Sequence, residues 1–233
     1  MALPIIETPT FEIDLPHTKG KEKFRPFLVK EEKLLIMANE SGEEQDMIRA
    51  TQQIVTNCSF GKIDGEKLPL FALQKIFLDL RAQSVASTIE LTLKCGGCDT
   101  PHNHKIDLKD LEVSENPEHS KKIKISDDIF VDMEYPSAFE VQELFKSTST
   151  DEMYKIMSKC LHVVYQGDEI FNAYESSDQE KQDWLESLSL EQFGKFKKFF
   201  ETMPVLAHEI NFTCGSCGRP NYIDFNGYQN FFV

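Results

Sequence analysis

Apolar positions follow two different periods along the chain, and the changes of period divide it into segments. Alternating apolar residues predict a β-hairpin over residues 11–26, because alternate residues of a strand face the same side. After it the apolar spacing becomes three to four residues, which predicts amphipathic helices within residues 30–41, 47–58 and 69–80. Residues 1–88 are therefore expected to form a hairpin followed by helices.

Two later segments share one pattern. Residues 89–108 and 208–226 each contain a strand-like stretch, a C-G-x-C sequence, a turn with a proline and a second strand-like stretch. Each is predicted to be a β-hairpin with two cysteines at its tip. Glycine between the two cysteines is expected to let the backbone turn tightly, so that both sulfurs can reach one ion. We expect the two hairpins to pair side by side.

The intervening residues, 114–204, combine a predicted hairpin around Ser126 with several helices. Four serines followed three positions later by Glu or Gln match the capping box, which satisfies free backbone N–H groups at a helix start. These serines are Ser137, Ser149, Ser177 and Ser189. After Ser149 an apolar stripe predicts a helix that continues to Val164 and therefore includes His162.

The cysteines of the two C-G-x-C sequences carry the candidate chemistry. Four thiolates in a tetrahedron are a preferred structural site for zinc, and they leave no open position for catalysis. The sequence therefore predicts a structural Zn²⁺ held by Cys95, Cys98, Cys214 and Cys217. Because the two pairs lie far apart, residues 114–204 must then be an insertion whose ends return to the same place.

Two other interpretations of these cysteines stay open at this point. All four could be free thiols. Alternatively, Cys95 and Cys98 could bind a metal together with His102 and His104, whose side chains share one side of an extended strand. That set leaves the second cysteine pair without a role. A thioredoxin-like redox pair is disfavoured, because its C-x-x-C opens a helix whereas these flanks are strand-like.

The remaining cysteines and histidines suggest no catalytic set. Cys58 and Cys160 lie on apolar stripes, so both are expected in the core, where free cysteine is common. The sequence contains no phosphate-binding G-x-x-x-x-G-K-[ST] or G-x-G-x-x-G motif, and no local Ser/His/Asp spacing. We therefore expect a protein that is not an enzyme, with no catalytic or cofactor-binding residues.

Charge narrows the class of partner. The 233 residues carry 25 basic and 39 acidic side chains, a formal net charge of -14, which would repel nucleic acid and anionic membranes. No apolar run approaches the roughly 20 residues of a membrane-spanning helix, and the first residues lack the pattern of a signal peptide. We expect the protein to be located in a reducing cytoplasm, where cysteines stay free or bind metal.

Two features suggest contacts with other proteins. The run from Asp168 to Glu191 holds eight carboxylates and one lysine, and it is either a solvated helical face or a docking surface for a basic partner. Tyr228, Phe231 and Phe232 form an apolar chain end. Such an end packs either on the protein itself or on a neighbouring chain, so self-association is one expectation.

Two helical segments resemble a known family. KFRPFLVKEEKLLIMANES (Lys23 to Ser41) and LPLFALQKIFLDLRAQSV (Leu68 to Val85), together with the two C-x-x-C hairpins, are similar to the T4-type bacteriophage baseplate protein family. The resemblance implies a late viral protein made in the bacterial host cytoplasm. It also implies a hub component or hub assembly protein of the contractile tail, with other hub and tail proteins as partners and no enzyme activity.

The sequence thus predicts an α+β fold, mainly helical, with short β-hairpins and a split zinc-ribbon-like element formed by two distant knuckles. Its expected parts are residues 1–88, residues 89–113 with 205–233, and the insertion 114–204. The expected function is a non-enzymatic role in the baseplate hub, either in the virion tail or as a transient assembly chaperone. A zinc-ribbon regulator that binds nucleic acid is the alternative from another class, which the net charge of -14 disfavours.

Overall fold

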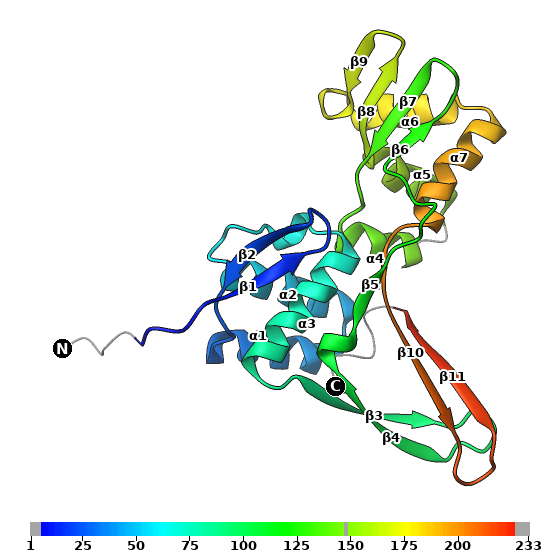
Figure 1. Cartoon of the computed structure of the whole chain (residues 1–233). Helices are drawn as coiled ribbons and strands as arrows, with labels where there is room; N and C mark the ends of the chain where they lie inside the picture. Colours follow the sequence, from blue (N-terminus) through cyan, green and yellow to red (C-terminus); the bar gives the residue numbers. More distant parts are fainter. Residues whose placement is uncertain (1–5, 147–148, 227–233) are drawn as a thin grey trace. The chain divides into compact units, whose positions relative to one another are not determined.

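The computed structural model describes residues 6–146 and 149–226 and shows an α+β fold of two compact units (Figure 1). Unit 1 comprises Met1–Ser114 and Val205–Val233, and unit 2 comprises Glu115–Pro204. Unit 2 is therefore inserted within the chain of unit 1. The three-part division expected from the sequence stays a prediction. The apolar end with Tyr228, Phe231 and Phe232 lies outside the described residues.

Unit 1 begins with the expected hairpin and helices. These elements are β1 (Phe11–Leu15), β2 (Gly20–Phe24), α1 (Val29–Ser41), α2 (Glu44–Cys58), the short 3-10 helix η1 (Gly65–Lys67) and α3 (Leu70–Ser84). The strands pair antiparallel, with Phe11 opposite Phe24. Gly42 ends α1 in the left-handed conformation, at a φ of 69° that glycine adopts without steric cost. The sequence predictions for this region are confirmed.

The core of unit 1 is centred on α2 and α3. Ile54 and Val55 of α2 and Phe77 and Leu80 of α3 are fully buried, as is Phe24 at the end of β2. Phe77 and Leu80 are three residues apart, which places them on one face of α3 as the sequence predicts. Ile54 and Val55 are consecutive and both belong to the buried face of α2. Each such side chain stabilises the fold by about 1.5–3 kcal/mol when it leaves water.

A buried ion pair joins the segment after β2 to the start of α1. The Arg25 and Glu31 side chains are 9% and 0% exposed, and two hydrogen bonds of 2.9 and 3.1 Å connect them. Glu31 also accepts a hydrogen bond from the Leu28 N–H. The backbone N–H of Arg25 donates to the carbonyl oxygen of Cys58 at the end of α2. The ion pair therefore closes the segment Lys23 to Ser41 on itself, and the backbone hydrogen bond from Arg25 to Cys58 joins that segment to α2.

The second half of unit 1 carries the cysteines. Its elements are β3 (Thr88–Lys94), β4 (Pro101–Asp107), the 3-10 helix η2 (Leu108–Asp110), β5 (Glu112–Ser114), β10 (Val205–Thr213) and β11 (Pro220–Asn226). β5 pairs antiparallel with the first residues of β10, with Val113 opposite Leu206. This pairing holds the two ends of the inserted unit side by side, so the chain re-enters unit 1 where it left.

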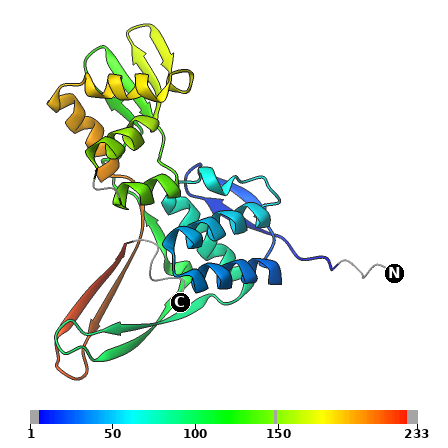
Figure 2. The ribbon, with the colours of Figure 1, turned by 180° about the vertical axis from the view of Figure 1, so that it is seen from behind.

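The two cysteine hairpins do not pair as the sequence suggested. β3 and β4 form a two-stranded sheet, whereas β10 lies between β11 and β5 in a three-stranded sheet. β5 takes the place beside β10 that the first hairpin was expected to fill. The two hairpins instead converge at their tips, as the two opposite views show (Figures 1 and 2).

Unit 2 packs helices against a four-stranded antiparallel sheet of order β6-β7-β8-β9. Its elements are β6 (Lys122–Lys124), β7 (Ile129–Met133), α4 (Ala138–Lys146), α5 (Thr150–Lys159), β8 (Leu161–Gln166), β9 (Glu169–Asn172), the 3-10 helix η3 (Ala173–Glu175), α6 (Asp178–Glu186) and α7 (Leu190–Glu201). Val131, Met157, Leu185, Phe196 and Phe199 are buried together in its core.

Three of the four predicted capping boxes are present. Ser177 and Ser189 each accept a hydrogen bond from the backbone three residues later, and the Glu or Gln there reaches back to the serine N–H. Ser137 and Glu140 form the same pair of bonds. Ser149 precedes α5 as predicted, but its side chain does not accept the capping bond.

The predicted helix after Ser149 is too long. α5 ends at Lys159, and Leu161–Gln166 is strand β8, which pairs with both β7 and β9. His162 is therefore on a strand, not on a helix. The sequence LHVVYQ is rich in β-branched and aromatic residues, which favour strands. Its short apolar stripe fitted helical and strand spacing equally, and the pairing partners decide between them.

The acidic run from Asp168 to Glu191 is not one helical face. It passes through β9, η3 and α6 and reaches the first turn of α7.

Among the helices that the structure describes, none has the length and apolar character needed to cross a membrane.

Candidate metal centre

The first knuckle is a closed turn at the tip of the β3–β4 hairpin. The N–H of Cys95 donates to the carbonyl oxygen of Thr100, and the N–H of Asp99 donates to that of Cys95, both at 3.0 Å. Asp99 has a left-handed backbone, with a φ of 55°. This turn holds Cys95 and Cys98 on the same side of the hairpin tip.

The second knuckle repeats this geometry. The N–H of Cys214 donates to the carbonyl oxygen of Arg219, and the N–H of Gly218 donates to that of Cys214, both at 2.9 Å. Gly218, which follows Cys217 as Asp99 follows its own cysteine, is also left-handed, with a φ of 72°. The similar C-G-x-C sequences thus fold into equivalent turns.

The residue of each knuckle that has a left-handed backbone is not one of the glycines between the cysteines. Gly96 and Gly215, which follow the first cysteine of each pair, do not have a positive φ. The left-handed residue follows the second cysteine, where Gly218 and an aspartate stand. Glycine and, less often, aspartate tolerate that conformation. The glycines between the cysteines are therefore not required by a left-handed backbone, and the position that does require one lies after the second cysteine.

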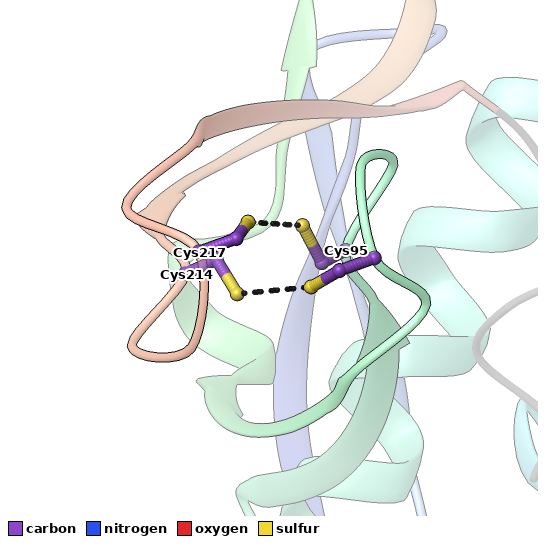
Figure 3. A group of neighbouring side chains, drawn as sticks. Cys95, Cys214 and Cys217 are labelled. Atoms are coloured by element: carbon purple, nitrogen blue, oxygen red, sulfur yellow. Dashed lines mark hydrogen bonds between the residues drawn. The ribbon is translucent and has the colours of Figure 1, made fainter.

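The four sulfur atoms meet between the two tips. Cys95 Sγ lies 3.7 Å from Cys217 Sγ, and Cys98 Sγ lies 3.6 Å from Cys214 Sγ. All four sulfurs lie within 4.8 Å of one another. Figure 3 shows the labelled side chains of Cys95, Cys214 and Cys217 directed into this shared space. The sequence partners are 122 and 116 positions apart, and the β5–β10 pairing brings them together.

These separations fit a zinc ion. A regular tetrahedron of sulfurs, each about 2.3 Å from zinc, has edges of about 3.8 Å. The 3.6 and 3.7 Å contacts are close to this value. They are far longer than a disulfide bond of about 2.05 Å, and all the cysteines are free thiols. The residues present therefore fit a four-thiolate metal site.

Two of the sulfurs are buried and two are exposed. Cys95 and Cys214 are 0% and 1% exposed, whereas Cys98 and Cys217 lie at the surface. The N–H of Gly97, which points at the sulfur of Cys95, lowers the pKa of Cys95 to about 6. The N–H of Arg219 favours the Cys217 thiolate, but the neighbouring thiols outweigh it and raise the pKa of Cys217 to about 12. Four thiols this close do not all ionise unless a cation compensates their charge.

Two side chains from the second hairpin hold the first knuckle. The buried Asn221 accepts a hydrogen bond from the N–H of Gly96 at 2.9 Å and donates to Cys95 Sγ at 3.6 Å. Arg219 donates to the carbonyl oxygen of Gly96 at 3.2 Å and packs so closely on Gly97 that a Cβ there would lie 2.8 Å from its Cδ. The knuckles are thus joined by direct hydrogen bonds in addition to the sulfurs.

His102 and His104 lie beside the cluster but are not part of it. Both rings pack on Phe212, with ring centres 5.0 and 4.6 Å away, so they do share one side of β4 as expected. His102 Nε2 lies 3.3 Å from Cys214 Sγ. Over the described ranges, the group of clustered ligand atoms contains the four cysteines and neither histidine. The geometry favours the four-cysteine set over the set with two histidines.

Asn221→Ala is expected to weaken metal binding by about 10- to 100-fold, the usual effect of losing a hydrogen bond to a metal ligand. The variant loses the bonds to Cys95 and Gly96 that align the first knuckle. Competition with a chromophoric zinc chelator measures the change. Asn211→Ala, an exposed position on the same hairpin, is the control and should bind as the wild type does. Equal affinities for the two variants would contradict the role of Asn221.

The remaining sequence candidates lie elsewhere. Cys58 and Cys160 are 0% and 3% exposed, which confirms their predicted place in the core. Burial raises the pKa of the Cys58 thiol to about 11. The roles of Asn221 and Arg219 were missed, because a hydrogen bond between two hairpins leaves no spacing signal. Their position within four residues of Cys217 was the one available clue.

The chain is similar to one family of known proteins. The family model described as T4 bacteriophage base plate protein matches residues 8–233. The chain belongs to this family. The resemblance seen in the sequence is confirmed, and membership indicates a phage baseplate protein. Comparison with curated proteins and with solved structures gives no significant match.

Proposed function

We propose that this baseplate protein acts without enzymatic activity in the hub of a contractile phage tail, as a scaffold stabilised by a structural zinc. The observation that supports the zinc assignment is the convergence of four thiols within 4.8 Å, with two sulfur pairs at the spacing of a tetrahedral zinc site. The family match supports the baseplate role, and the hub assignment rests on the resemblance of Lys23 to Ser41 and Leu68 to Val85. Other hub and tail proteins are the proposed partners.

The chemistry of the site fits structure better than catalysis. When bound, zinc would be held by Cys95, Cys98, Cys214 and Cys217, and four thiolates leave no position for a substrate. The two buried sulfurs and the Asn221 hydrogen bonds keep water from one side of the site. The ion would fasten the β10–β11 hairpin to the β3–β4 hairpin, and so fix the second chain segment of unit 1 to the first.

Metal analysis tests the zinc part. Protein purified without added metal is expected to contain one zinc per chain, and native mass spectrometry should show that mass increment with all six cysteines unoxidised. A chain with no metal and with Cys98 and Cys217 reacting freely with a thiol reagent would reject the assignment.

A separate experiment tests the hub role. A phage with this gene interrupted should produce heads but no complete baseplates in the host cytoplasm. Mass spectrometry of wild-type particles then separates a virion component, which we expect to detect, from a transient chaperone, which would be missing. Infectious particles with normal baseplates, formed without the gene, would refute the proposal while leaving the zinc site intact. A filter-binding assay at low salt addresses nucleic-acid binding, which the net charge of -14 opposes.

A further inference from the structure

Unit 2 contains a groove that the metal site and the proposed hub role do not explain. It lies between α5 and the connection from α6 to α7, and its volume is about 340 Å³. Its lining combines apolar and polar side chains, from Thr150, Asp151, Tyr154, Leu185, Glu186, Leu188, Leu190 and Phe193. All of these residues belong to unit 2, so the groove lies within one compact unit.

The floor of the groove is formed by two stacked aromatic rings. The rings of Tyr154 and Phe193 stack in parallel, with centres 5.1 Å apart and an interplanar angle of 6°. Leu185 beside them is 1% exposed and belongs to the core. Such a floor offers aromatic surface on which an apolar side chain can pack.

A highly exposed leucine forms one wall of the groove. Leu190, in the first turn of α7, is 91% exposed. A single exposed leucine is unremarkable, but Leu190 continues the apolar surface of Phe193 and Leu188 in the same groove. Continuous apolar surface with a polar rim is typical of protein contact sites.

The charged residues of the groove are all acidic. Asp151 comes from α5 and Glu186 from α6, and no lysine or arginine contributes to the lining. Within the part of the chain that the structure describes, neither carboxylate forms an ion pair. Other acids of these helices do: Asp178 pairs with Lys181, and Glu191 with Lys195. The groove therefore offers negative charge that the chain itself does not neutralise.

We propose that this groove binds a short basic segment of another protein. An aliphatic or aromatic side chain of that segment packs on the Tyr154–Phe193 stack and against Leu190, while lysine or arginine side chains lie beside Asp151 and Glu186. This assigns a docking role to the end of the acidic run from Asp168 to Glu191. The proposal does not rest on the metal site, because the four cysteines belong to unit 1.

A second copy of the chain suits the groove poorly. Each copy carries a net charge of -14, so two copies repel each other. The basic cluster on α7 is already paired, since Lys195, Lys197 and Lys198 each contact a glutamate. The charge of the groove therefore favours a basic partner of different sequence.

Selection from random peptides tests the proposal with a defined probe. The full chain is immobilised and exposed to displayed random twelve-residue peptides, and the best binders are synthesised with a fluorescent label. We expect the selected sequences to contain lysine or arginine within four residues of a leucine, phenylalanine or tryptophan. Their binding should weaken between 50 and 300 mM salt.

Matched variants locate the binding. Leu190→Asp should weaken the peptides at least tenfold, and the double variant Asp151→Asn with Glu186→Gln at least threefold. Ile170→Asp, at a residue 64% exposed on β9, makes the same apolar-to-acid change outside the groove and should bind as the wild type does. Asp168→Asn with Glu169→Gln is the matching charge control. Circular dichroism and urea denaturation establish that each variant is folded.

Several results would overturn the proposal. These are enrichment of acidic peptides, no enrichment at all, binding unchanged by Leu190→Asp, or equal losses with Ile170→Asp. Sedimentation of the wild type as a dimer that Leu190→Asp dissociates would assign the groove to a second copy instead. None of these outcomes depends on zinc content or baseplate assembly, so the proposed function is tested separately.

Discussion

Replacing Cys217 by serine is expected to abolish zinc binding and to lower the free energy of unfolding of unit 1 by more than about 3 kcal/mol. The side chain is exposed, and a substitution at an ordinary surface position costs within about 0.5 kcal/mol. The large effect is expected because one lost thiolate opens the tetrahedron and frees the β10–β11 hairpin. Metal analysis and urea denaturation measure the two consequences.

A chelator supplies the internal control for this variant. Chelation should bring the wild type down to the stability of Cys217→Ser and leave the variant itself unchanged, because both then lack the same ion. Ser216→Ala, an exposed neighbour in the same knuckle, should keep its zinc and its stability. If Cys217→Ser stayed as stable as Ser216→Ala, with a full complement of zinc, the four-cysteine site would be disproved.

Replacing Arg25 by methionine is expected to cost about 3–5 kcal/mol, because it leaves a buried charge without its partner. Burial alone would raise the pKa of Glu31, but the hydrogen bonds from Arg25 and from the Leu28 N–H lower it. Urea denaturation at neutral pH measures the loss. Lys21→Met, which breaks the exposed pair with Asp14, should change stability by no more than about 1 kcal/mol.

The pH dependence of this variant has the opposite sign to that of the wild type. In the wild type the folded-state pKa of Glu31 is below its ordinary value, so its contribution is full above that value and is lost as pH falls through the folded pKa. Without Arg25, burial raises the folded pKa, and the variant should gain relative stability as pH falls toward the ordinary value. Parallel pH profiles for both proteins would contradict the ion-pair argument.

A double variant separates burial from pairing. With both Arg25 and Glu31 replaced by methionine, no unpaired charge remains, and buried ion pairs are often replaced by apolar residues at little cost. We expect the double variant to be more stable than Arg25→Met alone. A double variant that is less stable by the sum of two independent losses would show that the two side chains act separately.

The sequence correctly predicted the elements that have a long periodic pattern of apolar residues or a clear capping residue at one end. α2 and α3 follow their apolar spacing, and Gly42, Ser177 and Ser189 mark helix ends through local chemistry. The helix prediction for the residues after Lys159 was wrong, because the spacing of their apolar residues fitted a helix and a strand equally well. β8 is a strand because β7 and β9 lie on either side of it, which is a tertiary cause.

The four cysteines that cluster at the candidate site were predictable from the sequence, whereas the contacts that support them were not. The repeated C-G-x-C pattern identified the four cysteines that the structure brings together. Two features of the site left no signal in the sequence, because each depends on contacts between distant segments: the β5–β10 pairing and the Asn221 hydrogen bonds. The buried Arg25–Glu31 pair, six residues apart, was missed as well. The apolar groove of unit 2 likewise joins residues from α5, α6 and α7.

The position of the inserted unit also sets an order of events during synthesis. Cys214 leaves the ribosome 116 residues after Cys98, a delay of about 6–23 s at translation rates of about 5–20 residues per second. Unit 2 lies between them and can fold within this interval, whereas the first knuckle waits with two unshielded thiols. If the proposed zinc arrives before Cys214 is synthesised, it meets only two of its four thiol ligands, so we expect stable binding only after the second knuckle has emerged.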